Sequence, residues 1–263
     1  MMSCLLPPEI LDLIIDQLHN EPTTLRACCL VSKSWIPRTR KHLFAHVEFD
    51  AEELTFISWM KTFPDPSNSP AHHTRILTVC RPASATDTAT DTDVTSCART
   101  FHNVVHLHYR CSFWADHKTR LVPFYGFSHT VRSLRLTHTS FEVFDLVCSF
   151  PLLEDLALVS LRLVADIVGW TAPSTSPKLT GSLELSTSDG FHIAIRRLLD
   201  FPDGLHFVEI TALCFYGDFE SMADLVSRCS GTLEYFSLCC FLPGEFPPAE
   251  FHNRSTPYRY SWT

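Results

Sequence analysis

The segment VRSLRLTHTSFEVFDLVCSFPLLEDLAL, residues 131–158, contains the pattern on which the fold depends. It opens with apolar residues at Val131, Leu134 and Leu136, and the same spacing begins again at Leu153. Apolar residues that alternate with polar ones over a short block are typical of a strand with one buried face. Between the two blocks, residues 140–150 place their apolar side chains three and four positions apart, which is typical of a helix. The segment therefore predicts a strand, a helix and a second strand.

The same spacing recurs through the region 71–242. Further matches are Val104/Leu107/Tyr109, Leu205/Val208/Ile210 and Leu233/Phe236/Leu238, with partial matches at Leu183/Leu185 and Leu77/Val79. Successive units begin about 20 to 30 residues apart, which is near the period of leucine-rich repeats. Helical spacing also fills 189–199 and 218–229, between later strands. Because one unit buries little alone, we expect about six stacked units, as an irregular solenoid without an asparagine ladder.

The first part of the chain has helical spacing instead. Ile10, Leu13, Ile14 and Leu18 recur at steps of three and four, and Pro22 separates this stretch from two further helical stretches. We expect three helices in a module over 3–47. A capping box formed by Asp50 and Glu53 predicts one more helix, within a connecting segment over 48–70. The predicted fold class is α/β, with a helical module followed by a repeat region.

The module has more apolar residues than one inner face can hold. A segment of this size rarely buries enough surface to fold without a partner or a staple. The surplus predicts a second apolar patch that serves as a docking site for another protein. An alternative is that the patch packs on the repeat region of the same chain.

The module resembles the F-box family in the order and spacing of its residues. The resemblance covers about 40 residues, through LPPEILDLIIDQL, LRACCLVSKSW and RTRKHLFAHV. It implies a three-helix module that docks on a Skp adaptor and so joins a Skp-cullin-F-box ubiquitin ligase. The adaptor-contact positions of the family match here at Leu6, Pro7, Ile10, Ile14, Leu18, Leu25, Val31 and Trp35. F-box proteins often carry leucine-rich repeats after the box, in agreement with the repeat pattern.

The expected function is therefore that of the substrate-recognition subunit of the ligase, which recruits a protein target for degradation and has no catalytic residues or cofactor of its own. A non-degradative interaction scaffold, with the helical module packed on its own repeats, stays open as an alternative. The basic residues Lys33, Arg38, Arg40 and Lys41 either face an acidic adaptor or form a solvated helix face.

The variable positions of the strands are expected to point outward and to contact the target. The predicted target-binding residues are His106, His108, Arg110, Arg135, Asp155, Glu184, Phe207, Glu209 and Tyr235. This surface changes from basic to acidic along the chain, with Phe207 and Tyr235 as aromatic anchors. We expect a protein target with a complementary charge gradient. The alternative is that helices or the tail cover some of these positions.

Composition and motif content argue against several other classes of function. The net charge of −8 gives no electrostatic reason to bind nucleic acid, and no apolar run is long enough for a membrane span. The 11 cysteines are odd in number and sit in apolar runs, so reduced thiols and a cytosolic or nuclear protein are expected. The chain has no glycine-rich phosphate loop. A zinc-binding enzyme, with ligands among Cys97, His102, His106, His108 and Cys111, is the least favoured alternative.

Two segments are expected to lie outside the packed units. The Thr- and Asp-rich segment 82–96 has nothing to bury and predicts a mobile loop. The tail, 243–263, contains no further strand-helix unit and either caps the end of the solenoid or is disordered.

Overall fold

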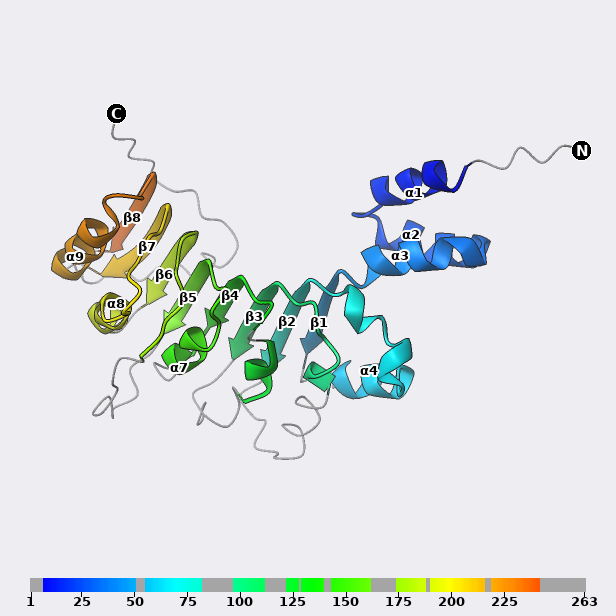
Figure 1. Cartoon of the computed structure of the whole chain (residues 1–263), viewed down its shortest axis with the longest axis horizontal. Helices are drawn as coiled ribbons and strands as arrows, with labels where there is room; N and C mark the ends of the chain where they lie inside the picture. Colours follow the sequence, from blue (N-terminus) through cyan, green and yellow to red (C-terminus); the bar gives the residue numbers. More distant parts are fainter. Residues whose placement is uncertain are drawn as a thin grey trace, which may run out of the picture.

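A computed structural model provides the structure of the chain (Figure 1). It describes residues 7–50, 55–81, 97–111, 122–127, 129–139, 143–161, 174–187, 190–215 and 219–241. Leu6, Glu53 and the segments 82–96 and 243–263, on which predictions were made, lie outside the described residues. No helix in the described ranges has both the length and the hydropathy that crossing a bilayer requires.

The chain is an α/β protein built on an eight-stranded sheet in which every neighbouring pair of strands is parallel. Its strands are β1 (His46–Asp50), β2 (Ile76–Arg81), β3 (His106–Cys111), β4 (Ser133–Thr137), β5 (Asp155–Leu161), β6 (Ser182–Thr187), β7 (Glu209–Phe215) and β8 (Tyr235–Phe241). The strands are ordered in the sheet as they are in the sequence, so each unit adds one strand beside the last.

The helices in the described residues form two groups (Figure 1). The helices α1 (Pro8–Gln17), α2 (Pro22–Val31) and α3 (Ile36–Leu43) lie beyond β1, at one end of the sheet. The helices α4 (Thr55–Thr62), α7 (Val143–Cys148), α8 (Phe191–Leu199) and α9 (Phe219–Cys229) follow strands and lie along one side of the sheet. Short 3₁₀ helices are η1 (Lys33–Trp35), η2 (Pro66–Asn68), η3 (Pro70–His73) and η4 (Val122–Phe127).

The predicted helices between strands are confirmed as α7, α8 and α9, which begin and end within three residues of the expected ranges. In the region 71–242, where about six units were expected, the described residues contain the seven strands β2 to β8. Strand β1 was missed. It contains only two apolar residues, Val47 and Phe49, and lies where the end of the helical module and the connecting segment were expected.

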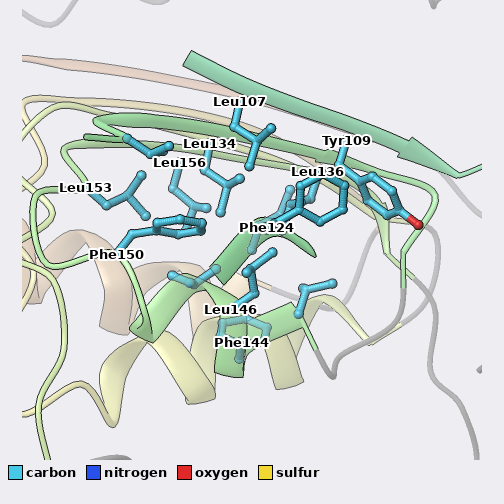
Figure 2. Packing of buried hydrophobic residues seen from close by; sticks show 14 of the residues in the cluster. Leu107, Tyr109, Phe124, Leu134, Leu136, Phe144, Leu146, Phe150, Leu153 and Leu156 are labelled. Atoms are coloured by element: carbon cyan, nitrogen blue, oxygen red, sulfur yellow. The ribbon is translucent and has the colours of Figure 1, made fainter. Parts of the chain in front are cut away.

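A continuous apolar core lies between the sheet and the helices that follow its strands. Leu107, Leu134 and Leu156 occupy the same row of neighbouring strands and point into the layer that holds Phe150 (Figure 2). Phe150, in the turn after α7, is fully buried in this layer. The stacking of strands thus buries the apolar positions of each unit against those of the next.

The spacing of two variable residues between the first apolar positions has a structural cause. In the unit of β4, the N–H groups of Arg132 and Ser133 both donate to the Val105 carbonyl, at 2.8 and 3.1 Å. Two successive residues therefore point outward before the strand alternation begins. The N–H groups of Glu154 and Asp155 share the Arg132 carbonyl in the same way.

This geometry corrects the predicted register of one unit. Phe207 was predicted to point outward as an aromatic anchor, but it is fully buried, whereas Val208 is 38% exposed. Leu205 and Ile210 are buried as predicted, but the spacing of the other units is matched by Phe207, Ile210 and Ala212, two residues later than the prediction. The small side chain of Ala212 concealed the third apolar position. Glu209 remains on the outward face, where it pairs in register with Tyr235.

Aromatic rings connect the helical module to the sheet. Phe44, just after α3, packs edge-on against Trp59 of α4, with ring centroids 5.7 Å apart. Trp59 in turn contacts Phe49 of β1 and Phe101, at 5.8 and 5.3 Å. The backbone continues the connection, because the Arg75 N–H donates to the Ala45 carbonyl at 2.8 Å. The module is therefore anchored through the C-terminal end of α3.

Candidate docking surfaces

The helical module has a small interior. Ile15, Leu25, Cys28 and Thr39 are its buried residues, one from α1, two from α2 and one from α3. The Thr39 hydroxyl donates to the Trp35 carbonyl at 2.8 Å, which satisfies a polar group without solvent. The interior thus depends on few side chains and needs contacts at its periphery.

One such contact is a charged cluster that joins α1 to α3. Arg38 donates from Nε to Asp16 Oδ1 at 2.6 Å and from Nη2 to Oδ2, and His42 Nε2 lies 2.7 Å from Oδ1. These hydrogen bonds, with Arg38 the larger cause, hold the pKa of Asp16 well below its usual range. Arg38 is therefore used in a contact within the module. In this respect it differs from the basic residues Arg40 and Lys41 beside it, which form no ion pair in the described residues.

The same module exposes large apolar side chains. Ile10, Leu13 and Ile14, on one face of α1, are 41%, 58% and 45% exposed. At the end of α2, Leu30 and Val31 are 89% and 68% exposed. The side chains of α1 are three and four residues apart, so they form a single ridge. Such exposed apolar groups on a small module are typical of a protein docking surface.

The eight predicted adaptor-contact residues are divided by this geometry. Pro7, Ile10, Ile14 and Val31 are exposed, Leu18 and Trp35 are half-buried, and Leu6 lies outside the described residues. Leu25 is only 1% exposed and packs inside the module, so in this conformation it supports the docking surface without contributing to it. Leu13 and Leu30 belong to the exposed set but were not among the predicted contacts. The three-residue spacing of Leu13 from Ile10 was the available signal for it.

The outward face of the sheet forms a second candidate surface, named the open face here. Register places one row of side chains across all eight strands: Glu48, Thr78, His108, Arg135, Ala157, Glu184, Thr211 and Ser237. The row before it includes His106, Asp155, Glu209 and Tyr235. All the predicted target-binding residues except Phe207 therefore lie on this face, brought together by strand pairing.

Arg135 and Glu184, two of the predicted target-binding residues, form an ion pair with each other. Arg135 of β4 donates to Glu184 of β6 through two hydrogen bonds of 2.6 and 3.0 Å. The strand between them carries Ala157 at the same level, and its small side chain lets the pair span β5. The pair is partly exposed, with side chains 42% and 39% accessible, so we expect it to contribute little to stability. Because the two charges of this pair cancel, the pair gives the centre of the open face no net charge.

Asp155 is similarly occupied. Its Oδ1 accepts from the Ser182 N–H at 2.7 Å and from the Ser182 hydroxyl at 2.9 Å. Gly181, just before β6, allows this approach, because a Cβ atom there would lie 2.2 Å from the same oxygen. Asp155 therefore has a structural role in holding β5 to β6.

Three histidines lie together on the first strands of the open face. His46 Nε2 is 3.1 Å from Thr78 Oγ1, and His106 and His108 project from the same side of β3. Burial lowers the pKa of His108, and the nearby Arg135, His46 and His106 lower it further. His108 is therefore neutral at pH 7, whereas Arg110 is an exposed cation on β3.

The predicted gradient from basic to acidic is thus weaker than the residue types suggested. Arg135 and Glu184 are paired, and Asp155 is bonded within the sheet. Arg110, Glu209 and Tyr235 are the exposed members of the predicted set. They lie on β3, β7 and β8, toward opposite ends of the open face.

The residues of the zinc alternative are not brought together. Cys97 is buried in the apolar core, and burial raises the pKa of its thiol to about 12. His106 and His108 are on the open face, and His102 is exposed. The side chain of Cys111 is not among those described. No group of three or more potential metal ligands was found in the described part of the chain.

Comparisons with known proteins add no assignment: no family model matches this chain, and no curated protein matches it.

Proposed function

We propose that this chain is the substrate-recognition subunit of a Skp-cullin-F-box type ubiquitin ligase. It docks on the Skp adaptor through the ridge on α1 and the end of α2, and it holds a protein target on the open face. The observation that carries the proposal is the exposure of Ile10, Ile14 and Val31, which stand at adaptor-contact positions in a sequence that resembles the F-box.

The arrangement of the module supports this assignment. Apolar side chains that are 41% to 68% exposed on these three residues are available for burial by a partner. In Figure 1, α1 and α2 project away from the sheet, so the ridge is not covered by the strands. This favours docking over the alternative scaffold, in which the module packs on its own repeats.

The sheet supports the second half of the proposal. Its parallel strands, one for each unit and with helices on one side, suit a leucine-rich-repeat-like solenoid that leaves the other face open for a target. A chain with both surfaces would raise the effective concentration of its target near a ubiquitin-charged enzyme. The chemistry would then belong to the partners.

Adaptor binding is the direct test. The double variant Ile10→Asp/Ile14→Asp places two charges on the ridge without entering the core. We expect its affinity for a purified Skp adaptor to fall at least about thirtyfold, because each isoleucine would lose roughly 1 kcal/mol of burial. Isothermal titration calorimetry on the full chain measures this change.

The matched control is Leu152→Asp, at an apolar residue 43% exposed near the start of β5 and far from the module along the chain. It should bind the adaptor as the unaltered chain does. Equal affinities for all three proteins, or no adaptor binding by the unaltered chain, would rule out the proposed docking mode.

The target surface is tested separately with the triple variant Arg110→Ala/Glu209→Ala/Tyr235→Ala. Adaptor binding should persist, while proximity labelling in cells should lose a subset of labelled proteins. An unchanged set of labelled proteins would end the assignment of the open face to target recognition.

A further inference from the structure

The end of α3 and the 3₁₀ helix η3 bring basic residues together where the module meets the sheet. Arg40 and Lys41 lie in the last turn of α3, and His72 and His73 lie in the last turn of η3. The two elements pack against each other, and the Thr74 hydroxyl donates to the Phe44 carbonyl at 2.9 Å. Residues about 30 positions apart in the sequence thus share one surface, named the junction patch here.

The patch is held in place by its own contacts. The rings of His72 and His73 are 3.9 Å apart between centroids. His72 donates from Nδ1 to the Ser69 carbonyl at 2.8 Å, and Asn103 donates to the His72 carbonyl at 2.7 Å. The imidazoles are therefore positioned before any ligand arrives, which lowers the entropic cost of binding.

The charges of the patch are not balanced within the described residues. Arg40 and Lys41 are exposed and form no ion pair there, whereas the neighbouring Arg38 is taken up by Asp16. Burial lowers the pKa of His73, and His72, Arg40 and Lys41 lower it further, so every charge acting on it is positive. The patch is thus a local excess of positive charge in a chain of net charge −8, which favours an anionic partner at this place.

We propose that the junction patch of Arg40, Lys41, His72 and His73 binds an acidic segment of the adaptor that docks on α1 and α2. This inference rests on the proposed function. A protein partner fits better than nucleic acid, because the four side chains of the patch offer few phosphate contacts. Arg38 of α3 faces Asp16 of α1, and Arg40, two residues further along the helix, faces another side of the module. The acidic segment therefore extends beyond the ridge to reach the patch.

The test compares charge reversal at the patch with charge reversal elsewhere. Arg40→Glu/Lys41→Glu should slow association with the purified adaptor and weaken binding about tenfold at 50 mM salt, but less than about twofold at 500 mM, where screening is short-ranged. Arg40→Gln/Lys41→Gln, which puts no carboxylate at the end of the helix, should weaken it about threefold at low salt. Lys178→Glu/Arg228→Glu changes the net charge equally at exposed sites in the later units and should have no effect.

The pH dependence gives a second measurement. His73 is neutral at pH 7, and an acidic segment would favour its protonated form. Adaptor affinity should therefore rise between pH 7.5 and pH 6 more steeply for the unaltered chain than for His73→Gln. The adaptor is the same in both measurements, so comparing the two pH dependences cancels the contribution of the adaptor's own titratable groups.

The outcomes separate this inference from the proposed function. If the ridge variant loses adaptor binding while Arg40→Glu/Lys41→Glu matches the charge control, only the junction patch is overturned. If the unaltered chain does not bind the adaptor, both fail. Tighter binding of a 20-nucleotide polyuridylate than of the adaptor, lost in Arg40→Glu/Lys41→Glu, would overturn the assignment of a protein partner.

Discussion

The helical module and the sheet region use apolar residues in opposite ways. The main core runs from Val47 to Cys229 and includes no residue of α1, α2 or α3. In the module, Ile15 of α1 and Leu25 of α2 are buried, while Ile10, Leu13 and Ile14 of α1 are 41% to 58% exposed. The sheet region thus buries most of its own apolar groups, whereas the module leaves exposed the apolar surface on which the proposed adaptor would dock. Stability and docking are therefore assigned to different parts of the chain.

The largest expected difference concerns one buried residue from each region. Phe150→Ala empties a fully buried position between α7 and β5, and we expect it to lower the free energy of unfolding by about 3 to 5 kcal/mol. Leu25→Ala removes a side chain that is 1% exposed, but its neighbours form a small interior of their own. We expect it to loosen the module while the sheet stays folded. Urea denaturation measures the first effect, and amide hydrogen exchange by mass spectrometry locates the second.

The pattern of exchange decides whether the comparison holds. Leu25→Ala should speed exchange in α1, α2 and α3 and leave β4 to β6 protected as before. Faster exchange throughout the sheet in Leu25→Ala would mean that the two regions unfold as one unit, and the contrast between them would be wrong.

The second prediction sharpens the description of the sheet region. Gly181→Ala places a Cβ atom 2.2 Å from Asp155 Oδ1 and 3.1 Å from the Glu154 carbonyl oxygen. The side chain of Asp155 must then leave Ser182, so we expect a loss of about 1 to 3 kcal/mol in stability by urea denaturation. Gly231→Ala is the matched control, because no atom lies within 4 Å of a Cβ there. It should be neutral or slightly stabilising, and equal losses in the two variants would contradict the steric argument.

Sequence reasoning succeeded where a local pattern determines burial. The first apolar positions Val104, Val131 and Leu153 were predicted and are fully or almost fully buried, because the shared carbonyl before each strand repeats the same spacing. The pattern failed at Phe207, where Val208 offered a false apolar match and Ala212 did not register as one. The α/β class therefore followed from periodicity, whereas the register of a single unit required its hydrogen bonds.

The candidate surfaces were harder to predict from the sequence. Exposure of Ile10 and Ile14 follows from helical spacing, but the burial of Leu25 depends on how α2 packs against α3. Pairing between β4 and β6 across Ala157 neutralises Arg135 and Glu184, and no local pattern reports a contact 49 residues apart. The same limit applies to Arg38, which the sequence grouped with its basic neighbours although it binds Asp16.

The smallest expected effect concerns that charged cluster, which links α1 to α3 at the edge of the module. Because the hydrogen bonds from Arg38 and His42 lower the pKa of Asp16, the cluster stabilises the module above the ordinary aspartate pKa near 3.9. The stabilisation is lost as the pH falls through the lower pKa of the folded state. Protection of α1 and α3 in hydrogen exchange, corrected for intrinsic rates, should therefore fall more steeply between pH 5 and pH 3 in the unaltered chain than in Asp16→Asn. Asp224→Asn, at an exposed site on α9, should behave as the unaltered chain does. A pH dependence of α1 and α3 that is the same in all three proteins would show that the cluster does not hold the two helices together, and the small interior around Leu25 would then have to do so alone.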